Sequence, residues 1–287
     1  MFVKDKFIKI SGYRMHYVEK GRGIPLLCIP GACAGLFVYN EIISRLQKYF
    51  RVYAIDPIGS GESEKPYKKY TLDFYIEQII EFLSKKKLGT VTLLGSSWGG
   101  ALVLAVALKF KRKIERLILI NPIVSERKHF VIYGVGSTLQ ALNLVHQGRK
   151  SLEWAKKYLE CRLSRLYYNK ELLTKSRFNK FFKAWKFPES RHAMISTLSD
   201  CDFKCLMDIN NLKKITQETL IIWGKKDPLF SIKGAKKLCR ILPNAKLKVI
   251  SDTGHGPAET RAEIVSRLIV DFLINQPNYS DRSILSM

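Results

Sequence analysis

The chain carries a serine, an aspartate and a histidine in local settings that suit nucleophilic hydrolysis. Ser97 lies in the segment GSSWG, between two apolar runs. Asp227 follows the apolar run TLIIW after a short turn, and His255 follows the strand-like run KLKVI in the same way. A serine hydroxyl becomes an effective nucleophile when an imidazole accepts its proton and a carboxylate orients that imidazole. The three residue types therefore indicate acyl transfer through an activated serine, provided that the fold brings them together.

The surroundings of Ser97 predict a strand, a tight turn and a helix. Residues 91–108 contain no charged side chain, which taken alone would also suit a membrane-spanning helix. Glycines and serines at positions 95 to 100 contradict that interpretation, because they stand where an apolar helix would carry bulk. Gly-x-Ser-x-Gly between a short apolar strand and an apolar helix has the pattern of a nucleophile elbow. We expect small residues on both sides of Ser97 because its backbone must adopt unfavourable angles there.

Strands and helices alternate through most of the chain, at intervals of roughly 30 residues. The predicted strands are residues 7–10, 13–18, 25–29, 51–55, 91–94, 116–120, 219–223 and 246–250. The predicted helices include residues 39–49, 72–83, 101–110, 232–241 and 258–274. This alternation indicates an α/β fold in which helices flank a mostly parallel central sheet.

The alternation stops between the sixth and seventh predicted strands. Residues 137–212 read as helical segments rich in lysine and aromatic residues, with no recognisable buried strand. We therefore predict a core domain of residues 1–121 and 216–287, with a helical cap (lid) of residues 122–215 inserted after the sixth strand. The carboxyl ends of parallel strands share one edge of a sheet, so the serine, aspartate and histidine can converge there.

Five motifs, in this order, resemble the α/β-hydrolase-fold superfamily in its capped, serine esterase-like form. They are the turn PGACAG after residue 29, the segment DPIGSGES, the elbow GSSWGG, the segment WGKKDP, and TGHGP before the last helix. The chain order serine, aspartate, histidine is also that of the α/β-hydrolase triad. The resemblance implies that Ser97 is the nucleophile, Asp227 the orienting acid and His255 the general base. Asp252 and Glu259 are rival candidates for the acid.

An oxyanion hole requires two backbone N–H groups directed at the developing negative charge. One is expected from Trp98, directly after the nucleophile. The resemblance implies that the other comes from Ala32, in the turn after the predicted strand 25–29. Most relatives have His-Gly at this turn where this chain has Pro30-Gly31, but the amide of Ala32 is available in either case.

Length and composition are those of a globular protein. The 287 residues, 46% hydrophobic and 26% charged, suffice for one large core with an inserted subdomain. The first residues do not form a secretory leader, so we expect a cytoplasmic protein with reduced thiols. The six cysteines lack the paired CxxC spacing of a zinc site, and no metal or organic cofactor is expected. Four histidines lack a loop context like that of His255 and are expected at the surface or in the cap: His16, His129, His146 and His192.

The chain is strongly basic, with 49 Lys and Arg against 25 Asp and Glu and a formal net charge of +24. Twelve basic and three acidic residues fall between Arg149 and Lys186, within the predicted cap. Such a surface attracts anions, so an acidic carrier protein, such as acyl carrier protein, an anionic surface or an anionic ester are candidate partners. A solvated, lysine-rich face explains the same charge. No specific nucleic-acid-binding motif occurs, and no transmembrane segment is expected.

The sequence thus predicts a serine hydrolase that cleaves a carboxylic ester or a related acyl compound through an acyl-enzyme. Two alternatives remain open. One is a carbon–carbon bond hydrolase acting on a diketone acid, and the other is a non-catalytic binding protein of the same fold. Aromatic residues of the cap are expected to pack it onto the core, and a few of them to line an apolar pocket for the small-molecule substrate. These aromatic residues are Phe130, Tyr133, Trp154, Tyr158, Tyr167, Tyr168, Phe181, Phe182, Trp185 and Phe187.

Overall fold

The centre of the computed structural model is an eight-stranded sheet, and the structure describes residues 5–123 and 135–274. The strand order is β1-β2-β4-β3-β5-β6-β7-β8. The strands are β1 (Lys6–Ile10), β2 (Tyr13–Lys20), β3 (Pro25–Ile29), β4 (Arg51–Asp56), β5 (Val91–Ser96), β6 (Ile114–Ile120), β7 (Glu218–Gly224) and β8 (Ala245–Ile250). β2 pairs antiparallel with β1 and β4, and the remaining neighbours pair in parallel. The predicted α/β fold with a mostly parallel sheet flanked by helices is confirmed.

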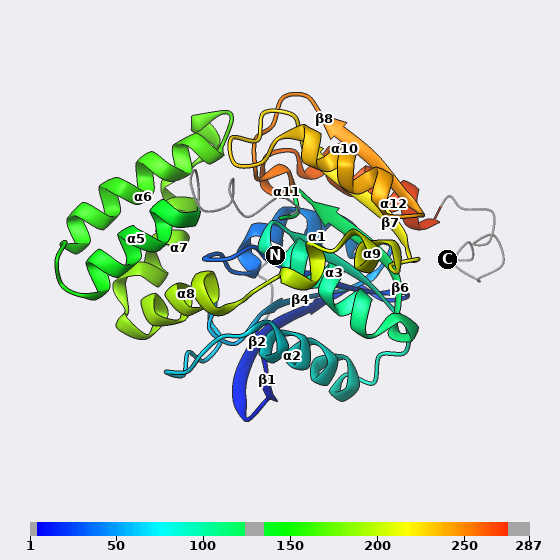
Figure 1. The fold of residues 1–287 in the computed structure, drawn as a ribbon, viewed down its shortest axis with the longest axis horizontal. Helices are drawn as coiled ribbons and strands as arrows, with labels where there is room; N and C mark the ends of the chain where they lie inside the picture. Colours follow the sequence, from blue (N-terminus) through cyan, green and yellow to red (C-terminus); the bar gives the residue numbers. More distant parts are fainter. Residues whose placement is uncertain (1–4, 124–134, 275–287) are drawn as a thin grey trace.

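Helices cover both faces of this sheet, as buried parallel strands require (Figure 1). They are α1 (Asn40–Leu46) and α12 (Ala262–Ile274) on one face, and α2 (Leu72–Lys85), α3 (Trp98–Lys109) and α10 (Ile232–Ile241) on the other. Successive strand residues point to opposite faces, so Leu93 packs with α2 and α3 while Leu94 packs with α1 and α12. The charge-free stretch 91–108 forms β5 and most of α3, which is the predicted strand, turn and helix. Within the described residues, no helix is both long and apolar enough to cross a membrane.

Two predicted helices differ in detail from the structure. The predicted helix 39–49 begins as the 3₁₀ helix η1 (Leu36–Tyr39) and continues as α1, which ends at Leu46. The predicted helix 258–274 is divided into α11 (Pro257–Thr260) and α12. Arg261 separates them because its φ of −137° and ψ of 42° lie outside the helical region. Glu259 consequently lies on a short, separate helix.

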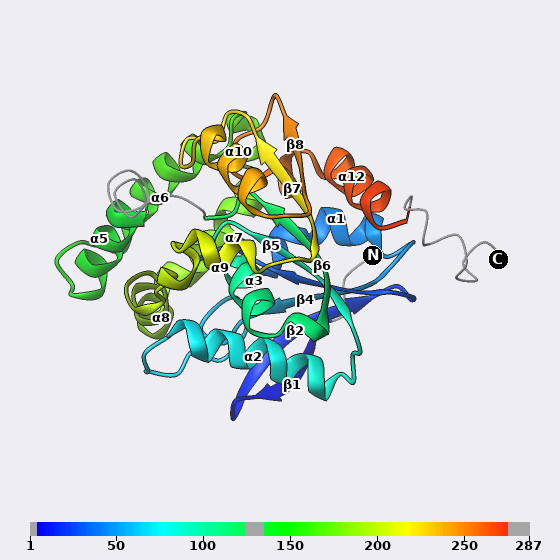
Figure 2. The same ribbon diagram turned by 45° about the vertical axis from the view of Figure 1, so that its right-hand side comes forward.

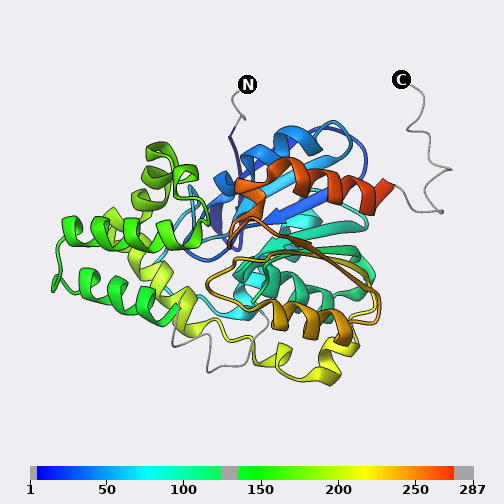
Figure 3. The ribbon, with the colours of Figure 1, turned by 90° about the horizontal axis from the view of Figure 1, so that it is seen from above.

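A cluster of helices between β6 and β7 stands to one side of the sheet (Figures 1, 2 and 3). We call four of them the helical insertion: α5 (Val135–His146), α6 (Leu152–Leu166), α7 (Lys175–Lys186) and α8 (Pro188–Asp200). The helical insertion has an apolar core of its own, in which Trp185 is 1% exposed. The following α9 (Ile209–Lys213) packs instead beside the sheet, against α3 and α10. The predicted domain boundaries at residues 121 and 216 stay a prediction.

Candidate active site

Ser97 lies at the sharp turn from β5 into α3. Its φ of 53° and ψ of −119° are strained angles for a residue with a side chain. Neighbouring backbone holds them, since the Ser97 amide donates to the carbonyl of Ile120 at 2.9 Å. A Cβ at Gly99 would lie 2.3 Å from the carbonyl oxygen of Ile29, and one at Gly95 would lie 2.3 Å from that of Gly99. Both glycines are therefore required for the elbow geometry that the sequence predicts.

Asp227 and His255 are joined by a hydrogen bond at the carboxyl ends of β7 and β8. The His255 Nδ1 atom lies 2.8 Å from Oδ2 of Asp227, whose side chain is 0% exposed. The other oxygen, Oδ1, accepts hydrogen bonds from the amides of Leu229 at 2.7 Å and Phe230 at 3.2 Å. Asn121 donates its side-chain amide to Oδ2. The carboxylate is thus held by directed donors from three segments of the chain.

Burial favours the neutral form of Asp227, yet the pKa of this carboxyl is lowered below its usual value. The charge and hydrogen bond of His255 outweigh burial, with help from the hydrogen bonds of Asn121 and the Leu229 amide. Asp227 is therefore a carboxylate that can orient the imidazole and stabilise its protonated form.

Ser97 and His255 line one cavity of about 120 Å³. Its walls come from the sheet edge and the helical insertion, which supplies Leu163, Leu166 and Phe181, together with Tyr167, which follows α6. Within the described residues, no hydrogen bond joins the Ser97 hydroxyl to His255. Hydrogen bonds of this kind are often long in an unliganded site and shorten when a substrate binds. The structure therefore joins Asp227 to His255 directly and brings Ser97 to the same cavity.

The two rival carboxylates have other partners. Asp252 forms an exposed ion pair with Arg261. Glu259 accepts a hydrogen bond from the hydroxyl of Tyr167 at 2.7 Å. Of the three candidate acids, Asp227 is the one that is hydrogen-bonded to His255.

The turn after β3 lies directly beside the nucleophile. A Cβ at Gly31 would be 3.3 Å from Cβ of Ser97 and 3.9 Å from its hydroxyl oxygen. Within the described residues, no hydrogen bond from the Ala32 amide is recorded. Trp98 is the first residue of α3, and amides of a first helical turn have no acceptor inside the helix. Both amides are therefore available to an anion near Ser97, and the helix dipole favours negative charge at this end of α3.

Two residues that support the site were not predicted. Asn121 follows β6 with a φ of 42°, donates to Asp227, and accepts a hydrogen bond from the amide of Gly224 at 3.0 Å. Its sequence context, Asn-Pro after a strand, predicts only a strand end. The hydroxyl of Tyr39 donates to the carbonyl of Ile29 at 2.7 Å and shares a hydrogen bond with the hydroxyl of Ser96 at 2.9 Å. Tyr39 thus links the residue before the nucleophile to the end of β3.

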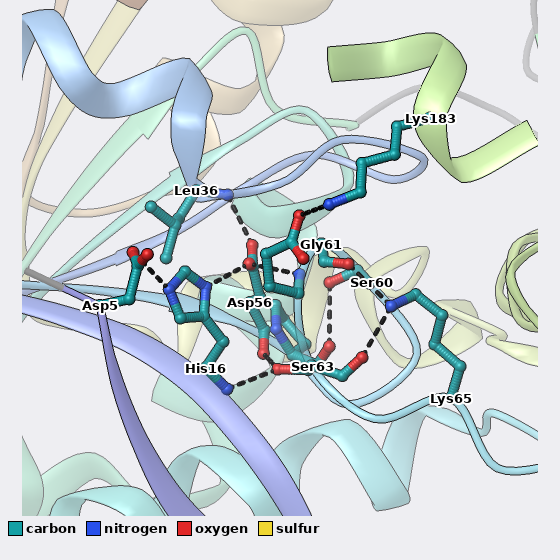
Figure 4. Close-up of polar contacts among 11 residues, drawn as sticks. Asp5, His16, Leu36, Asp56, Ser60, Gly61, Ser63, Lys65 and Lys183 are labelled. Atoms are coloured by element: carbon teal, nitrogen blue, oxygen red, sulfur yellow. Dashed lines mark hydrogen bonds and ion pairs between the residues drawn. The ribbon is translucent and has the colours of Figure 1, made fainter. Parts of the chain in front are cut away.

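The prediction for His16 is wrong, because this residue lies on β2 of the central sheet and is buried. Its side chain is 4% exposed, with Nδ1 at 2.7 Å from Oδ2 of Asp56 and Nε2 at 3.0 Å from Oδ1 of Asp5 (Figure 4). The partner Asp56 ends β4, which pairs with β2 in the register His16 to Asp56. No local sequence signal reveals this contact, since the pairing depends on the antiparallel register of two strands.

Asp56 connects this histidine to the turn that carries Ala32. Its Oδ1 accepts a hydrogen bond from the amide of Leu36 at 2.6 Å, and its Oδ2 accepts one from the amide of Glu62 at 2.9 Å (Figure 4). Leu36 follows the glycine-rich turn after β3, so the carboxylate fixes the far end of that turn. Lys183 of α7 reaches the same region through an ion pair with Glu62 at 2.5 Å.

The other histidines and aromatic residues named in the sequence analysis lie in several different places. His129, Phe130 and Tyr133 lie outside the described residues. His146 and His192 lie in α5 and α8 of the helical insertion. Of the aromatic residues, Phe182 and Trp185 belong to the core of the helical insertion, while Tyr167 and Phe181 line the cavity.

The helical insertion touches the histidine loop directly. The His255 amide donates to the carbonyl of Leu166, at the end of α6, at 3.1 Å. A Cβ at Gly254 would be 2.3 Å from that carbonyl oxygen, so only glycine permits this approach. The contact holds the end of α6 beside His255.

Comparison with known proteins identifies the family. The family model described as alpha/beta hydrolase fold matches residues 24–262, so the chain belongs to the α/β-hydrolase fold family. The 2-hydroxymuconate semialdehyde hydrolase of Pseudomonas putida is 26% identical over 287 residues, which cover 93% of this chain and 92% of that protein. Human epoxide hydrolase 4 is 24% identical over 292 residues, covering 96% and 79% respectively.

A solved structure agrees with this assignment of the fold. The meta-cleavage product hydrolase from Pseudomonas fluorescens IP01 matches with a TM-score of 0.78 at 22% identity, covering 94% of this chain and 97% of that chain. The protein is therefore a hydrolase of the α/β fold, and the proteins to which it is similar include a 2-hydroxymuconate semialdehyde hydrolase and an epoxide hydrolase.

The buried histidine generates a prediction on stability against pH. Burial disfavours the imidazolium, but the hydrogen bonds and charges of Asp56 and Asp5 outweigh it and raise the pKa of His16 above its usual value. Its stabilising contribution is therefore complete below the unfolded pKa and is lost as pH rises through the folded pKa. Urea unfolding should show wild type losing stability relative to His16→Gln as the pH rises above about 6.5, by about 1.4 kcal/mol per unit of raised pKa. Asp5→Asn should remove part of this pH dependence, because Asp5 is one of the two carboxylates that raise the pKa of His16. A difference in stability between wild type and His16→Gln that does not depend on pH would contradict the account.

The close approach at Gly254 generates a second prediction. Gly254→Ala places a methyl group against the Leu166 carbonyl and should separate α6 from the histidine loop, lowering the free energy of unfolding by about 1–3 kcal/mol. Hydrogen exchange at the His255 amide should become faster, because its acceptor moves away. Gly256→Ala is the matched control, since its Cβ would meet no atom closer than 3.5 Å. Equal effects of the two substitutions on exchange would show that the contact is unimportant.

Proposed function

We propose that the protein is a serine hydrolase that cleaves a carboxylic ester, or a related acyl substrate, through an acyl-enzyme. The observation that carries this proposal is the buried hydrogen bond between Asp227 and His255 beside a cavity that Ser97 also lines. A carboxylate, an imidazole and a serine on a strained elbow are the groups that acyl transfer by serine needs.

In the proposed mechanism, Oγ of Ser97 attacks the carbonyl carbon of the ester while Nε2 of His255 accepts the hydroxyl proton. Asp227 keeps the proton of the neutral imidazole on Nδ1 and stabilises the imidazolium that forms. The amides of Ala32 and Trp98 donate to the oxyanion of the tetrahedral intermediate. The imidazolium then protonates the departing alkoxide, which leaves as an alcohol. A water molecule attacks the acyl-enzyme with His255 again acting as base, and this step releases the acid and regenerates Ser97.

The size and lining of the cavity support a small acyl or alcohol group as the bound part of the substrate. Its lining is largely apolar, with Val38 and Ile120 from the core domain and Leu163 and Phe181 from the helical insertion. We propose that the helical insertion acts as a lid over the ester bond, because it supplies one wall of this cavity. Water exclusion by such a lid would strengthen the hydrogen bonds to the oxyanion.

A serine substitution tests the proposal. Ser97→Ala should lower kcat on p-nitrophenyl esters by roughly 10⁴-fold or more, the scale of triad substitutions. A fluorophosphonate probe should label wild type and fail to label this variant. Ser199→Ala is a matched control, because Ser199 is an exposed serine of α8 that bonds its own helix backbone. Ester hydrolysis that persists in Ser97→Ala would identify another nucleophile, whereas folded wild type that neither reacts nor turns over would favour the non-catalytic binding protein.

A second candidate function is cleavage of a carbon–carbon bond in a diketone acid. It is favoured by the similarity to the 2-hydroxymuconate semialdehyde hydrolase of Pseudomonas putida. The two candidates are separated by comparing kcat/KM on p-nitrophenyl butyrate and on 2-hydroxymuconate semialdehyde. The ester proposal predicts the larger value for the ester, and the reverse order would establish the carbon–carbon hydrolase instead.

An acidic partner for the basic helical insertion stays a prediction. The described contacts use a few of its charges in ion pairs, such as Lys183 with Glu62 and Arg177 with Glu259. Binding of an acyl carrier protein to this face would weaken steeply as salt rises, because the attraction between exposed charges is screened. Binding that does not depend on salt would leave a solvated, lysine-rich face as the explanation.

A further inference from the structure

The cavity beside Ser97 contains a carboxyl group that the proposed mechanism does not use. Glu259 of α11 and Tyr167, which follows α6, both line this cavity together with Ser97 and His255. The Glu259 side chain is 10% exposed, and Tyr167 is 5% exposed. One of these residues comes from the core domain and the other from the chain that leaves α6, so they meet where the predicted lid closes on the sheet.

The two carboxylate oxygens of Glu259 have different partners. Oε2 accepts the hydrogen bond from the Tyr167 hydroxyl at 2.7 Å. Oε1 lies 3.9 Å from Nε of Arg177, which is an ion-pair distance but too long for a hydrogen bond. Other nitrogens of Arg177 donate to backbone carbonyls of Leu172 and of Glu259 itself. Within the described residues, Oε1 therefore has no recorded hydrogen-bond donor.

Burial raises the pKa of Glu259 to about 7, against the lowering effects of the Tyr167 hydrogen bond and of the positive charges on Arg177 and Lys180. His255 is the remaining titratable group of the cavity wall near it. The carboxyl group is therefore neutral below about pH 7 and becomes an anion above it. An anion that faces this cavity gains free energy when a substrate donor pairs with it, because hydrogen bonds to charged groups are stronger than those between neutral groups.

We propose that Glu259, oriented by Tyr167, is a specificity-determining residue that accepts a hydrogen bond from a hydroxyl or amino group on the substrate and disfavours a carboxylate at that position. This inference rests on the proposed function for its substrate class. A hydroxyl group would supply the missing donor to Oε1. A substrate carboxylate would instead lie beside the Glu259 carboxylate in a poorly solvated site, where the repulsion between the two anions disfavours the charged form of each. The preferred substrates are thus esters whose chain carries a neutral or cationic donor.

Three methyl esters of matched length test the inference: methyl 6-hydroxyhexanoate, methyl heptanoate and monomethyl adipate. Their dissociation constants are measured by calorimetry in Ser97→Ala, where no turnover interferes, and their kcat/KM values are measured in wild type. At about pH 8.5, Ser97→Ala should bind the hydroxy ester about tenfold more tightly than monomethyl adipate, as expected for a hydrogen bond to a charged group. This ratio should shrink as the pH falls below about 7, because protonation removes the anion.

Combining Glu259→Gln with Ser97→Ala should reduce the ratio of affinities for the hydroxy ester and monomethyl adipate to near one and remove its dependence on pH. The matched control is Glu263→Gln, which removes an exposed carboxylate of α12 whose side chain is 80% exposed. Tyr167→Phe keeps the carboxyl group and provides a second variant if Glu259→Gln does not fold. Since the Tyr167 hydrogen bond lowers the pKa of Glu259, the preference in Tyr167→Phe should appear only at higher pH than in Ser97→Ala alone.

The inference is overturned if the ratio is the same with and without Glu259→Gln, if the carboxylate ester binds more tightly, or if none of the three esters binds. Selective binding without any turnover in wild type would support the inference and refute the proposed hydrolysis of esters. Turnover of all three esters at equal kcat/KM, with equal affinities, would support the hydrolysis and refute the inference.

Discussion

The rest of the site depends on the hydrogen bond between Asp227 and His255, because this bond requires a charged carboxylate in a buried position. An aspartate with no exposed side-chain surface would be neutral unless several donors held its charge. Asn121 and two backbone amides supply those donors, so the carboxylate remains ionised and can hold the imidazole. All of these groups lie at the carboxyl ends of parallel strands, which is the edge where such a fold collects its functional residues. The parallel sheet thus gathers the donors that stabilise the buried charge of Asp227 beside His255.

The elements around this pair are positioned by close backbone contacts. Gly99 allows the elbow to touch the end of β3, and Gly254 allows α6 to touch the histidine loop. Asp56 ties the turn that carries Ala32 to β4 and, through His16, to β2. Because each contact joins segments distant in sequence, the site is assembled by the whole fold, and the helical insertion is part of that assembly through its contact with His255.

The sequence predicts those parts of the structure that are indicated by the residues of one short segment. The buried strands, the charge-free elbow around Ser97 and the loops carrying Asp227 and His255 each have a composition that indicates their place. The break at Arg261 was not predictable, because Ala258 to Ile274 has an uninterrupted apolar periodicity. The contacts of His16 with Asp56 and of Tyr167 with Glu259 join residues 40 and 92 positions apart, and only the tertiary register or the packing of the helical insertion decides them. A histidine on a strand carries no sign of whether it faces solvent or a buried carboxylate.

The central claim is that Ser97 reacts with the help of His255 and Asp227. The most direct measurement is a crystal structure of the protein after reaction with a p-nitrophenyl alkylphosphonate, which imitates the tetrahedral intermediate. We predict phosphorus bonded to Oγ of Ser97, a phosphoryl oxygen accepting hydrogen bonds from the amides of Ala32 and Trp98, and Nε2 of His255 within hydrogen-bond distance of the adduct. A phosphonate on another residue, or a His255 imidazole turned away from the adduct, would contradict the account.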